Sequence, residues 1–577
     1  MKALRLLAPL LALLASPAAQ AQQPSAADPE AASGIEAKAL VHASRQMVVA
    51  ANPHAARAGL DILRKGGSAL DAAIAAQMVL NLVEPQSSGI GGGAFLLHWD
   101  GKDVTSFDGR ETAPAAARPD RFLGPDNQAM KYREAVKSGR SIGVPGLLRM
   151  LEMAHAQHGA LPWADLFAPA IELAESGFPV SPRLARLLDW AGADSFSADG
   201  RALYFDGEGK ARPAGYLLHN PALAATLRRV AIEGAKVLHE GELAGAIVAA
   251  VNAAPHSAGD MTAGDIAAYR ALARPPLCVN YRVWKICGMG PPSSGGSTVA
   301  ATLKMLEAQD LGHEPLAAAA LHLIAEAEKL AYADRDRYVA DPDFVPVPSG
   351  LTETAYLAER AMGIDPERAM QKARPGKPPG AKEGAFGADA TLESAGTSHI
   401  SVVDAQGRAA AMTTTIESGF GSGIMVGGFL LNNELTDFSF QPVSKDGRPV
   451  ANRVEGGKRS RSSMSPTLVF DADGRLRMVT GSPGGSRIIL YVVKTLIAHL
   501  DWGLDAQASA ALANFGSRNG PFEIETGSAA GISAALAAKG HEVRELPMTS
   551  GTHSIVVTRQ GLQGGADPRR EGVALGD

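Results

Sequence analysis

A polar cluster of Gly, Thr, Ser and His stands directly before an alternating apolar segment in this 577-residue chain. The segment reads AGTSHISVVD and places Thr397 at the boundary. A surface hairpin can begin this way, and so can the new amino terminus of an enzyme that cuts itself before Thr397. An amino-terminal threonine carries both a nucleophilic hydroxyl and a general base, its α-amino group. Thr397 is therefore the first candidate for catalysis.

The register of a hairpin that begins at Thr397 can be counted. The segment TSHISVVDAQGRAAAMTTTI alternates on both sides of a turn near Gln406. Residues facing each other across a hairpin have a constant sum of numbers, so we expect Thr397 opposite Thr415, with side chains within about 5 Å. Such a threonine pair is also common in strands without any catalytic role.

A second hairpin, SSMSPTLVFDADGRLRMVTGSPGG, turns near Asp473. The same count puts Ser462 and Ser463 level with Gly484 and Gly485, at the strand ends away from the turn. The glycines lead into an apolar helix expected over residues 486–503, whose first N–H groups favour a negative oxygen. Ordinary turn serines and an ordinary strand-to-helix connection are the alternative interpretation.

Several elements must position these groups. Helical periodicity dominates up to about residue 372, and period-two strands follow residue 396 until about residue 482. Between them, residues 373–396 are rich in Gly, Pro and Ala, which predicts a mobile loop. Thr397 lies where that loop meets the first strand.

The amino terminus predicts export. Lys2 and Arg5 precede an apolar run over residues 6–14, and small residues end at Ala21, so residues 1–21 are interpreted as a cleaved signal peptide. That run is too short for a membrane anchor, and no later segment could span a bilayer. We expect a periplasmic protein, and the net charge of −5 and pI near 6.3 argue against a nucleic-acid or anionic-membrane partner.

Cys278 and Cys287 are the only cysteines, and they stand close together in CVNYRVWKIC. In an exported protein they could form a local disulfide, but the sequence leaves their pairing open. Neither CxxC nor HExxH occurs, so no metal or other cofactor is expected.

Two glycine-containing motifs resemble those of dinucleotide-binding proteins and of serine hydrolases. GIGGG at residues 89–93 follows a helix and precedes a strand, the reverse of a dinucleotide fingerprint. GRSIG at residues 139–143 matches a nucleophile elbow, yet no buried strand precedes it and Pro145 stands where the elbow should enter its helix. We interpret Ser141 as part of a helix-start turn.

Seven blocks in order resemble the gamma-glutamyltranspeptidases: GGSALDAAIAAQMVLNLVEPQSSGIGGGAFLLHWDG, FDGRETAP, PPSSGGST, GTSHISVVD, GGFLLNNELTDFS, RSSMSPTLV and TGSPGGSRII. The resemblance covers nearly all of the mature chain. It implies an α+β fold, the four-layer αββα sandwich of N-terminal nucleophile hydrolases. It also implies cleavage between Gly396 and Thr397 into a large chain, residues 22–396, and a small chain, residues 397–577, which stay together as a heterodimer.

The resemblance also implies roles for individual residues. The implied catalytic group comprises the nucleophile Thr397, the threonine that holds its oxygen, Thr415, and the oxyanion-hole glycines Gly484 and Gly485. The implied carboxylate donors are Arg110, Ser462 and Ser463, and the implied acceptors for the substrate ammonium group are Glu434 and Asp437. The implied substrates are γ-glutamyl amides, with glutathione as the default donor and water or an amine as acceptor.

The sequence departs from the family pattern in two places. Glu417 replaces the usual asparagine, which predicts three crowded carboxylates at the ammonium site with at least one raised pKa. The lid region, residues 437–462, has no aromatic residue beyond Phe440. Two alternatives remain, a glutaryl or cephalosporin-type acylase of the same family and a binding protein without turnover. Asp437 argues against the acylase, because a glutaryl group has no ammonium, and Thr397 argues against the binding protein.

Overall fold

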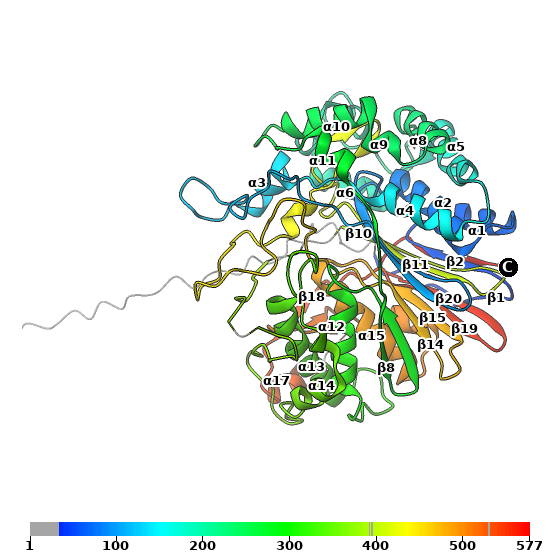
Figure 1. The fold of residues 1–577 in the computed structure, drawn as a ribbon. Helices are drawn as coiled ribbons and strands as arrows, with labels where there is room; N and C mark the ends of the chain where they lie inside the picture. The colour runs from blue at the N-terminus through cyan, green and yellow to red at the C-terminus, as the bar shows by residue number, and fades with distance from the viewer. Residues whose placement is uncertain (1–33, 383, 392, 394–395, 529–530) are drawn as a thin grey trace, which may run out of the picture.

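The computed structural model describes residues 34–382, 384–391, 393, 396–528 and 531–577. The expected signal peptide lies outside the described residues. Two seven-stranded sheets form the centre of the molecule, and helices cover both outer faces (Figure 1). The chain thus has the four-layer αββα arrangement expected from the resemblance.

The first sheet carries Thr397 and is antiparallel throughout. In spatial order its strands are β21 (Val573–Gly576), β2 (Met47–Ala50), β10 (Thr397–Val403), β11 (Ala409–Thr415), β3 (Gly93–Trp99), β4 (Val104–Asp108) and β7 (Leu272–Arg274). Strands β10 and β11 lie near its middle, and every residue of both is buried. The nucleophile candidate therefore begins a fully buried strand.

The second sheet packs face to face against the first. In spatial order its strands are β1 (Val41–Ala43), β20 (Gly561–Ala566), β19 (His553–Thr558), β15 (Leu476–Gly481), β14 (Thr467–Phe470), β9 (Trp284–Gly288) and β8 (Leu277–Tyr281). An apolar cluster that includes Val49, Leu97, Leu468 and Val479 fills the space between the sheets.

One helical layer covers the first sheet. It includes α1 (Pro53–Arg64), α2 (Ala69–Val83), α4 (Leu147–His158), α5 (Ala168–Ser176) and α8 (Pro221–Glu233). Asn52 caps α1 before a proline at the first helical position, and Ser68 and Asp71 form a capping box on α2. Helix α2 is buried along its whole length, which its small alanine side chains permit.

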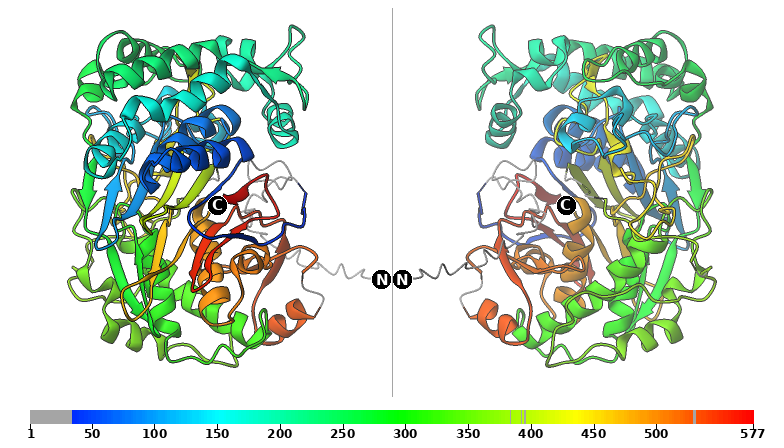
Figure 2. Two further views of the ribbon diagram at one scale, coloured as in Figure 1. Left: turned by 90° about the vertical axis from the view of Figure 1, so that its right-hand side faces the viewer. Right: turned by 90° about the vertical axis from the view of Figure 1, so that its left-hand side faces the viewer.

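The other helical layer covers the second sheet, and Figure 2 shows both sheets between the two layers. It includes α12 (Gly295–Leu306), α13 (Ala318–Tyr338), α14 (Thr354–Ala361), α15 (Ile488–Leu500) and α16 (Ala506–Ala511). The helix expected over residues 486–503 is confirmed as α15, preceded by a short 3-10 turn, Gly485–Arg487.

The two rejected glycine motifs have structural roles. Gly92 lies so close to the first sheet that a Cβ atom there would stand 2.1 Å from the carbonyl oxygen of Thr415. Ser141 ends a 3-10 turn, and its hydroxyl donates to the carbonyl oxygens of Val136 and Ser138 at 3.0 and 2.8 Å. A serine engaged in this way is not an exposed nucleophile.

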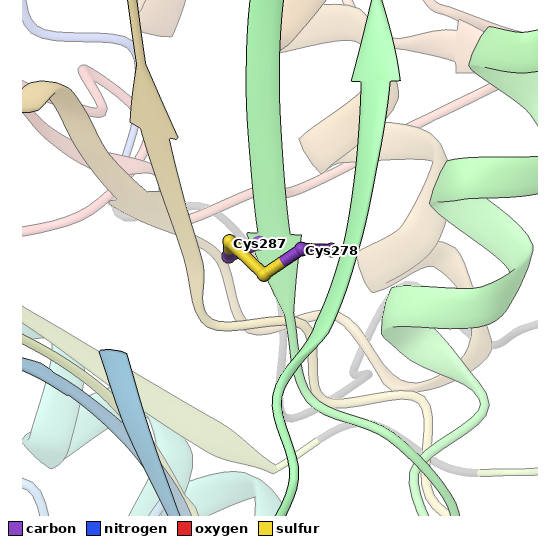
Figure 3. Close-up of a disulfide and its surroundings, with 2 residues drawn as sticks. All are labelled: Cys278 and Cys287. Carbon is purple, nitrogen blue, oxygen red and sulfur yellow. A yellow bond between two sulfur atoms is a disulfide. The ribbon is translucent and has the colours of Figure 1, made fainter. Parts of the chain in front are cut away.

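Cys278 and Cys287 form a disulfide across the β8–β9 hairpin, where they are direct partners (Figure 3). This settles the pairing that the sequence left open. No helix in the described part of the chain is long and apolar enough to cross a membrane.

Candidate active site

The hairpin that begins at Thr397 has the counted register. Thr397 pairs with Thr415, and the ladder continues to Val403 opposite Ala409. Both threonines are buried, with 5% and 3% of their surface exposed. The sequence-based prediction that these two side chains share one end of a hairpin is confirmed.

The Gly396–Thr397 peptide bond lies against Thr415. The Thr415 hydroxyl donates to the carbonyl oxygen of Gly396 at 2.9 Å and accepts from the backbone N–H of Glu417 at 2.7 Å. A Cβ atom on Gly396 would stand 2.0 Å from the carbonyl oxygen of Glu417, so only glycine fits there. A hydroxyl that donates to a carbonyl oxygen withdraws electrons from the carbonyl carbon and favours attack on it.

The second hairpin also has the counted register, with Thr467 opposite Thr480. The ladder stops there, so Ser462, Ser463 and the two glycines lie in the connections beyond it. Gly484 and Gly485 have positive φ angles of 140° and 55°, which explains two glycines in this turn. They precede the buried helix α15, whose first N–H groups have no partner within the helix.

A small cavity lies beside Thr397. Nine predicted site residues line it: Arg110, Thr397, Thr415, Glu417, Glu434, Asp437, Ser462, Ser463 and Gly485. Gly484 is not among the lining residues. The structure thus brings together residues that are far apart in the chain, from Arg110 to Gly485. The catalytic and binding roles of the individual residues remain predictions.

Arg110 has different partners from those the resemblance implies. Its guanidinium donates to Glu434 and, at 2.5 Å, to Asp437, and its remaining donors reach the carbonyl oxygens of Ser460 and Arg461 at 3.2 and 3.0 Å. The implied carboxylate donor is therefore bonded to the two implied ammonium acceptors. A desolvated network of this kind fixes the position of both acids.

Burial dominates the acid–base behaviour of this group. It raises the pKa values of Glu434 and Asp437 well above their usual range, although the charge of Arg110 opposes the shift. Glu111 lies behind Glu434, and burial raises its pKa to about 7, again against the attraction of Arg110. Simultaneous ionisation of these carboxyl groups is therefore unfavourable. The charge of Glu417 also raises the pKa values of Glu434 and Asp437, so the crowding of these three carboxylates that the sequence predicts is observed.

Several neutral side chains bind the carboxylate of Glu417. Its carboxylate accepts from the Tyr132 hydroxyl at 2.9 Å and from the Asn433 side chain at 2.6 Å, and Ser418 donates to it as well. Its backbone has a φ of +76°, a conformation that asparagine adopts more readily than glutamate. The departure from the family pattern therefore stores some backbone strain beside the cavity.

Glu393 is a cavity residue that sequence reasoning missed. Its side chain is 3% exposed and contacts Arg335, Arg461 and Ser463. Burial would raise its pKa, but the two guanidiniums and the serine hydroxyl hold that pKa at about 2. Composition identified its segment only as a loop. The described residues of 373–396 do lack helices and strands, but several make specific contacts, such as Gly376 N–H with Asp334 at 2.6 Å.

A second polar cluster lies outside this cavity. His322, Glu326 and His541 stand close enough to hold a metal ion. The sequence contains no metal-binding motif that would have indicated this cluster. Nδ1 of His322 is 2.8 Å from Nε2 of His541, and the Lys329 ammonium donates to Glu326 at 2.9 Å. The polar atoms of this cluster already contact one another, and the Lys329 ammonium beside them would repel a bound metal cation. We assign the cluster a structural role.

Known proteins are similar to this chain in both sequence and fold. Residues 55–577 match the family model described as gamma-glutamyltranspeptidase. The glutathione hydrolase proenzyme of Bacillus subtilis (strain 168) is 35% identical over 546 residues, 92% of this chain and 91% of the relative. The acylase ACY 1 proenzyme of Pseudomonas sp. (strain V22) is 34% identical over 546 residues, 92% and 93% of the two chains.

Among solved structures, cephalosporin acylase from Bacillus halodurans superposes with a TM-score of 0.82 and 27% identity, covering 94% of this chain and 97% of the other. The fold is that of the N-terminal nucleophile hydrolases. This chain belongs to the gamma-glutamyltranspeptidase family.

Proposed function

We propose that this family member is a self-processing γ-glutamyltransferase and glutathione hydrolase. It would be exported to the periplasm, lose residues 1–21, and mature into a large chain of residues 22–396 and a small chain of residues 397–577. The charged and apolar leader supports export, and the disulfide suits an oxidising compartment.

Self-cleavage would start from the arrangement at the hairpin end. The Thr397 hydroxyl attacks the Gly396 carbonyl carbon, and its proton passes to the departing Thr397 nitrogen as the peptide becomes an ester. Water then hydrolyses the ester, which leaves a carboxylate on Gly396 and a free amine on Thr397. The hydrogen bond from Thr415 to the Gly396 carbonyl oxygen supports the first step.

Turnover would reuse the same hydroxyl. The α-amine of Thr397, a group whose pKa is ordinarily about 7.7–8.0, takes the hydroxyl proton as the oxygen attacks the γ-glutamyl carbonyl. N–H groups at Gly484 and Gly485 would stabilise the oxyanion. The amide C–N bond breaks, the protonated amine leaves, and water or an acceptor amine resolves the γ-glutamyl ester on Thr397.

One observation favours γ-glutamyl over glutaryl substrates. Within the described residues, Oδ1 of the buried Asp437 has no hydrogen-bond partner, although its other oxygen contacts Arg110. A substrate ammonium would supply the missing donor, with Glu417 and Glu434 nearby in the same cavity. A glutaryl group would leave that oxygen unpaired, at a cost of roughly 1–3 kcal/mol.

A side-by-side assay of γ-glutamyl and glutaryl p-nitroanilide tests the proposal. We expect kcat/KM to favour the γ-glutamyl substrate by at least about tenfold, or about 1.4 kcal/mol. Asp437→Asn should reduce that preference, because the variant loses the charge that pairs with the ammonium. A preference for the glutaryl substrate would instead identify the chain as an acylase, the second candidate that its acylase relatives support.

A further inference from the structure

Tyr332 is buried on α13 and reaches the glycine turn beside the cavity. Its side chain is 1% exposed, and its hydroxyl donates to the carbonyl oxygen of Ser486 at 2.5 Å. Ser486 directly follows Gly485 in the 3-10 turn that precedes α15. Helix α13 belongs to the proposed large chain and the turn to the proposed small chain, so this hydrogen bond joins the two.

The hydrogen bond from Tyr332 is the first of a chain of hydrogen bonds. The carbonyl oxygen of Ser486 and the N–H of Arg487 belong to one peptide unit, and that N–H donates to the carbonyl oxygen of Gly484 at 3.0 Å. The carbonyl oxygen of Gly484 and the N–H of Gly485 belong in turn to one peptide unit. Each bond withdraws electrons from the next N–H, so successive bonds strengthen one another. The chain ends at Gly485, which lines the cavity.

Other contacts to the same turn involve its side chains. The Arg518 guanidinium donates to the Ser486 hydroxyl at 2.7 Å and to Glu523 at 2.8 Å, and Glu523 also accepts from Arg487 at 2.7 Å. These contacts anchor the turn from the outside of its backbone. The Tyr332 hydroxyl instead contacts a backbone carbonyl oxygen, and it therefore acts on the peptide units themselves.

The Tyr332 hydroxyl keeps its proton. Burial raises its pKa well above the ordinary range, although the charges of Arg335 and Arg518 oppose the shift. The Arg335 guanidinium lies 5.5 Å from the centre of the Tyr332 ring, and this cation–π contact helps to fix the ring. Tyr332 is therefore a fixed hydrogen-bond donor at the start of the chain.

We propose that Tyr332 is a positioning residue for the oxyanion, because its hydroxyl orients and polarises the N–H of Gly485 through two peptide units. The inference rests on the proposed function, in which Gly484 and Gly485 stabilise the negative oxygen. Tyr332 is not among the residues that line the cavity, so it acts through the turn and not on the substrate. Self-cleavage should not need this chain, because the Gly396 carbonyl oxygen accepts from Thr415.

Tyr332→Phe removes the hydroxyl and keeps the ring. The variant should mature like the wild type, as seen on a denaturing gel. With γ-glutamyl p-nitroanilide we expect kcat to fall about threefold to tenfold, the size expected for one lost neutral hydrogen bond. The oxyanion forms in both acylation and deacylation, so both steps should slow together and KM should change less than about twofold.

Tyr338→Phe is the matched control. Tyr338 is also buried on α13, and its hydroxyl donates to the carbonyl oxygen of Gly376 at 2.7 Å, away from the cavity. This variant loses the same kind of hydrogen bond from the same helix, so it should keep the kcat and the KM of the wild type. Equal losses of kcat in the two variants would assign the effect to the packing of α13 and overturn the inference.

A tetrahedral inhibitor distinguishes positioning of the oxyanion from a general loss of packing. In the boronic acid whose boron replaces the γ-carboxyl carbon of glutamate, the Thr397 oxygen adds to boron and its proton passes to the α-amine. The resulting boronate carries a negative charge, as the reaction intermediate does. Tyr332→Phe should weaken this inhibitor by about the same factor as kcat, while inhibition by glutamate, which forms no tetrahedral species, should stay within about twofold.

Four results would overturn the inference: an unchanged kcat in Tyr332→Phe, a loss confined to KM, equal weakening of the boronic acid and glutamate, or failure of Tyr332→Phe to mature while Tyr338→Phe matures. If the wild type turns over γ-glutamyl anilide and any of these is seen, the positioning role alone fails. If the wild type cleaves glutaryl anilide and not γ-glutamyl anilide, the proposed function fails, while a kcat loss on glutaryl anilide in Tyr332→Phe still supports the positioning role. A wild type that cleaves neither anilide overturns both.

Discussion

The two sides of the cavity shift the pKa of a buried carboxyl group in opposite directions. On one side, Glu434 and Asp437 share a single guanidinium, that of Arg110, and burial raises both pKa values well above the usual range. On the other side, Glu393 contacts both Arg335 and Arg461, and its pKa is held at about 2. Glu434 and Asp437 thus share one guanidinium, whereas Glu393 contacts two.

Thr397 lines the same cavity. Thr397, the proposed nucleophile, lies at the end of a buried strand, and Glu393 lines the same cavity. In the proposed function, this strand fixes where the attack occurs. Each prediction below changes one partner in this arrangement.

Thr397→Ala should have the largest effect. Without the hydroxyl neither self-cleavage nor acyl transfer is possible, so a denaturing gel should show one chain and activity should fall on the order of a thousandfold or more. Thr414→Ala, one position before Thr415 and facing Ser398, is the control and should still mature. A Thr397→Ala protein that is still cut after Gly396 would exclude Thr397 as the processing nucleophile.

Arg110→Lys should weaken substrate binding, because Arg110 is the expected carboxylate donor and also holds Glu434 and Asp437. A lysine keeps the charge but cannot bridge Glu434 and Asp437 as a planar fork does. We expect kcat/KM for γ-glutamyl p-nitroanilide to fall about tenfold to a hundredfold, or about 1.4–2.7 kcal/mol. Self-cleavage should remain, because it requires no substrate. Failure to mature would assign Arg110 a structural role instead.

Glu393→Gln tests the arginine-rich side in the uncut Thr397→Ala protein. The folded pKa of Glu393, about 2, lies below its ordinary value of 4.5, so its stabilisation is present above pH 4.5 and is lost as the pH falls towards 2. The glutamine variant should lose on the order of 3 kcal/mol near neutral pH, and the difference should shrink in acid. Denaturant unfolding across this pH range measures it.

The control for that experiment is Glu367→Gln, because Glu367 is 83% exposed and pairs with Lys539 at the surface. Exposed pairs contribute little, so this variant should unfold like its parent at every pH. A Glu393→Gln deficit that persists unchanged at low pH would mean that Glu393 acts through shape rather than through charge.

Glu417→Asn should have the smallest effect. Asparagine retains an oxygen that can accept from Tyr132 and relieves the strain of a glutamate at φ +76°. We expect γ-glutamyl activity within about tenfold of the wild type, a window of about 1.4 kcal/mol. Glu417→Ala removes the acceptor and should lose more. If both variants only lower thermal stability and keep the substrate preference, Glu417 does not contact the substrate.

The sequence predicted the features that depend on local periodicity, namely hairpin registers and the start of a helix. A hairpin register follows from strand alternation and one turn position, and for this reason both counts held and Thr397 was placed opposite Thr415. The start of α15 followed from the glycine pair and the apolar run. Sequence order alone excluded the dinucleotide and elbow motifs.

The sequence could not predict contacts that join distant segments. Glu393 meets Arg335 and Ser463 across 58 and 70 positions, and nothing in its loop composition marks it. The bonding of Arg110 to the two acids likewise depends on how β4, the lid region and the serine connection converge. The resemblance named residues of which nine line one cavity, and packing decided which of them pair with one another.

The most direct test is the mass of the small chain during turnover. Matured enzyme mixed with γ-glutamyl p-nitroanilide and quenched with acid should contain residues 397–577 carrying one γ-glutamyl group, and fragmentation should place that group on Thr397. An adduct on Ser462, Ser463 or the large chain, or an active enzyme that was never cut, would contradict the account.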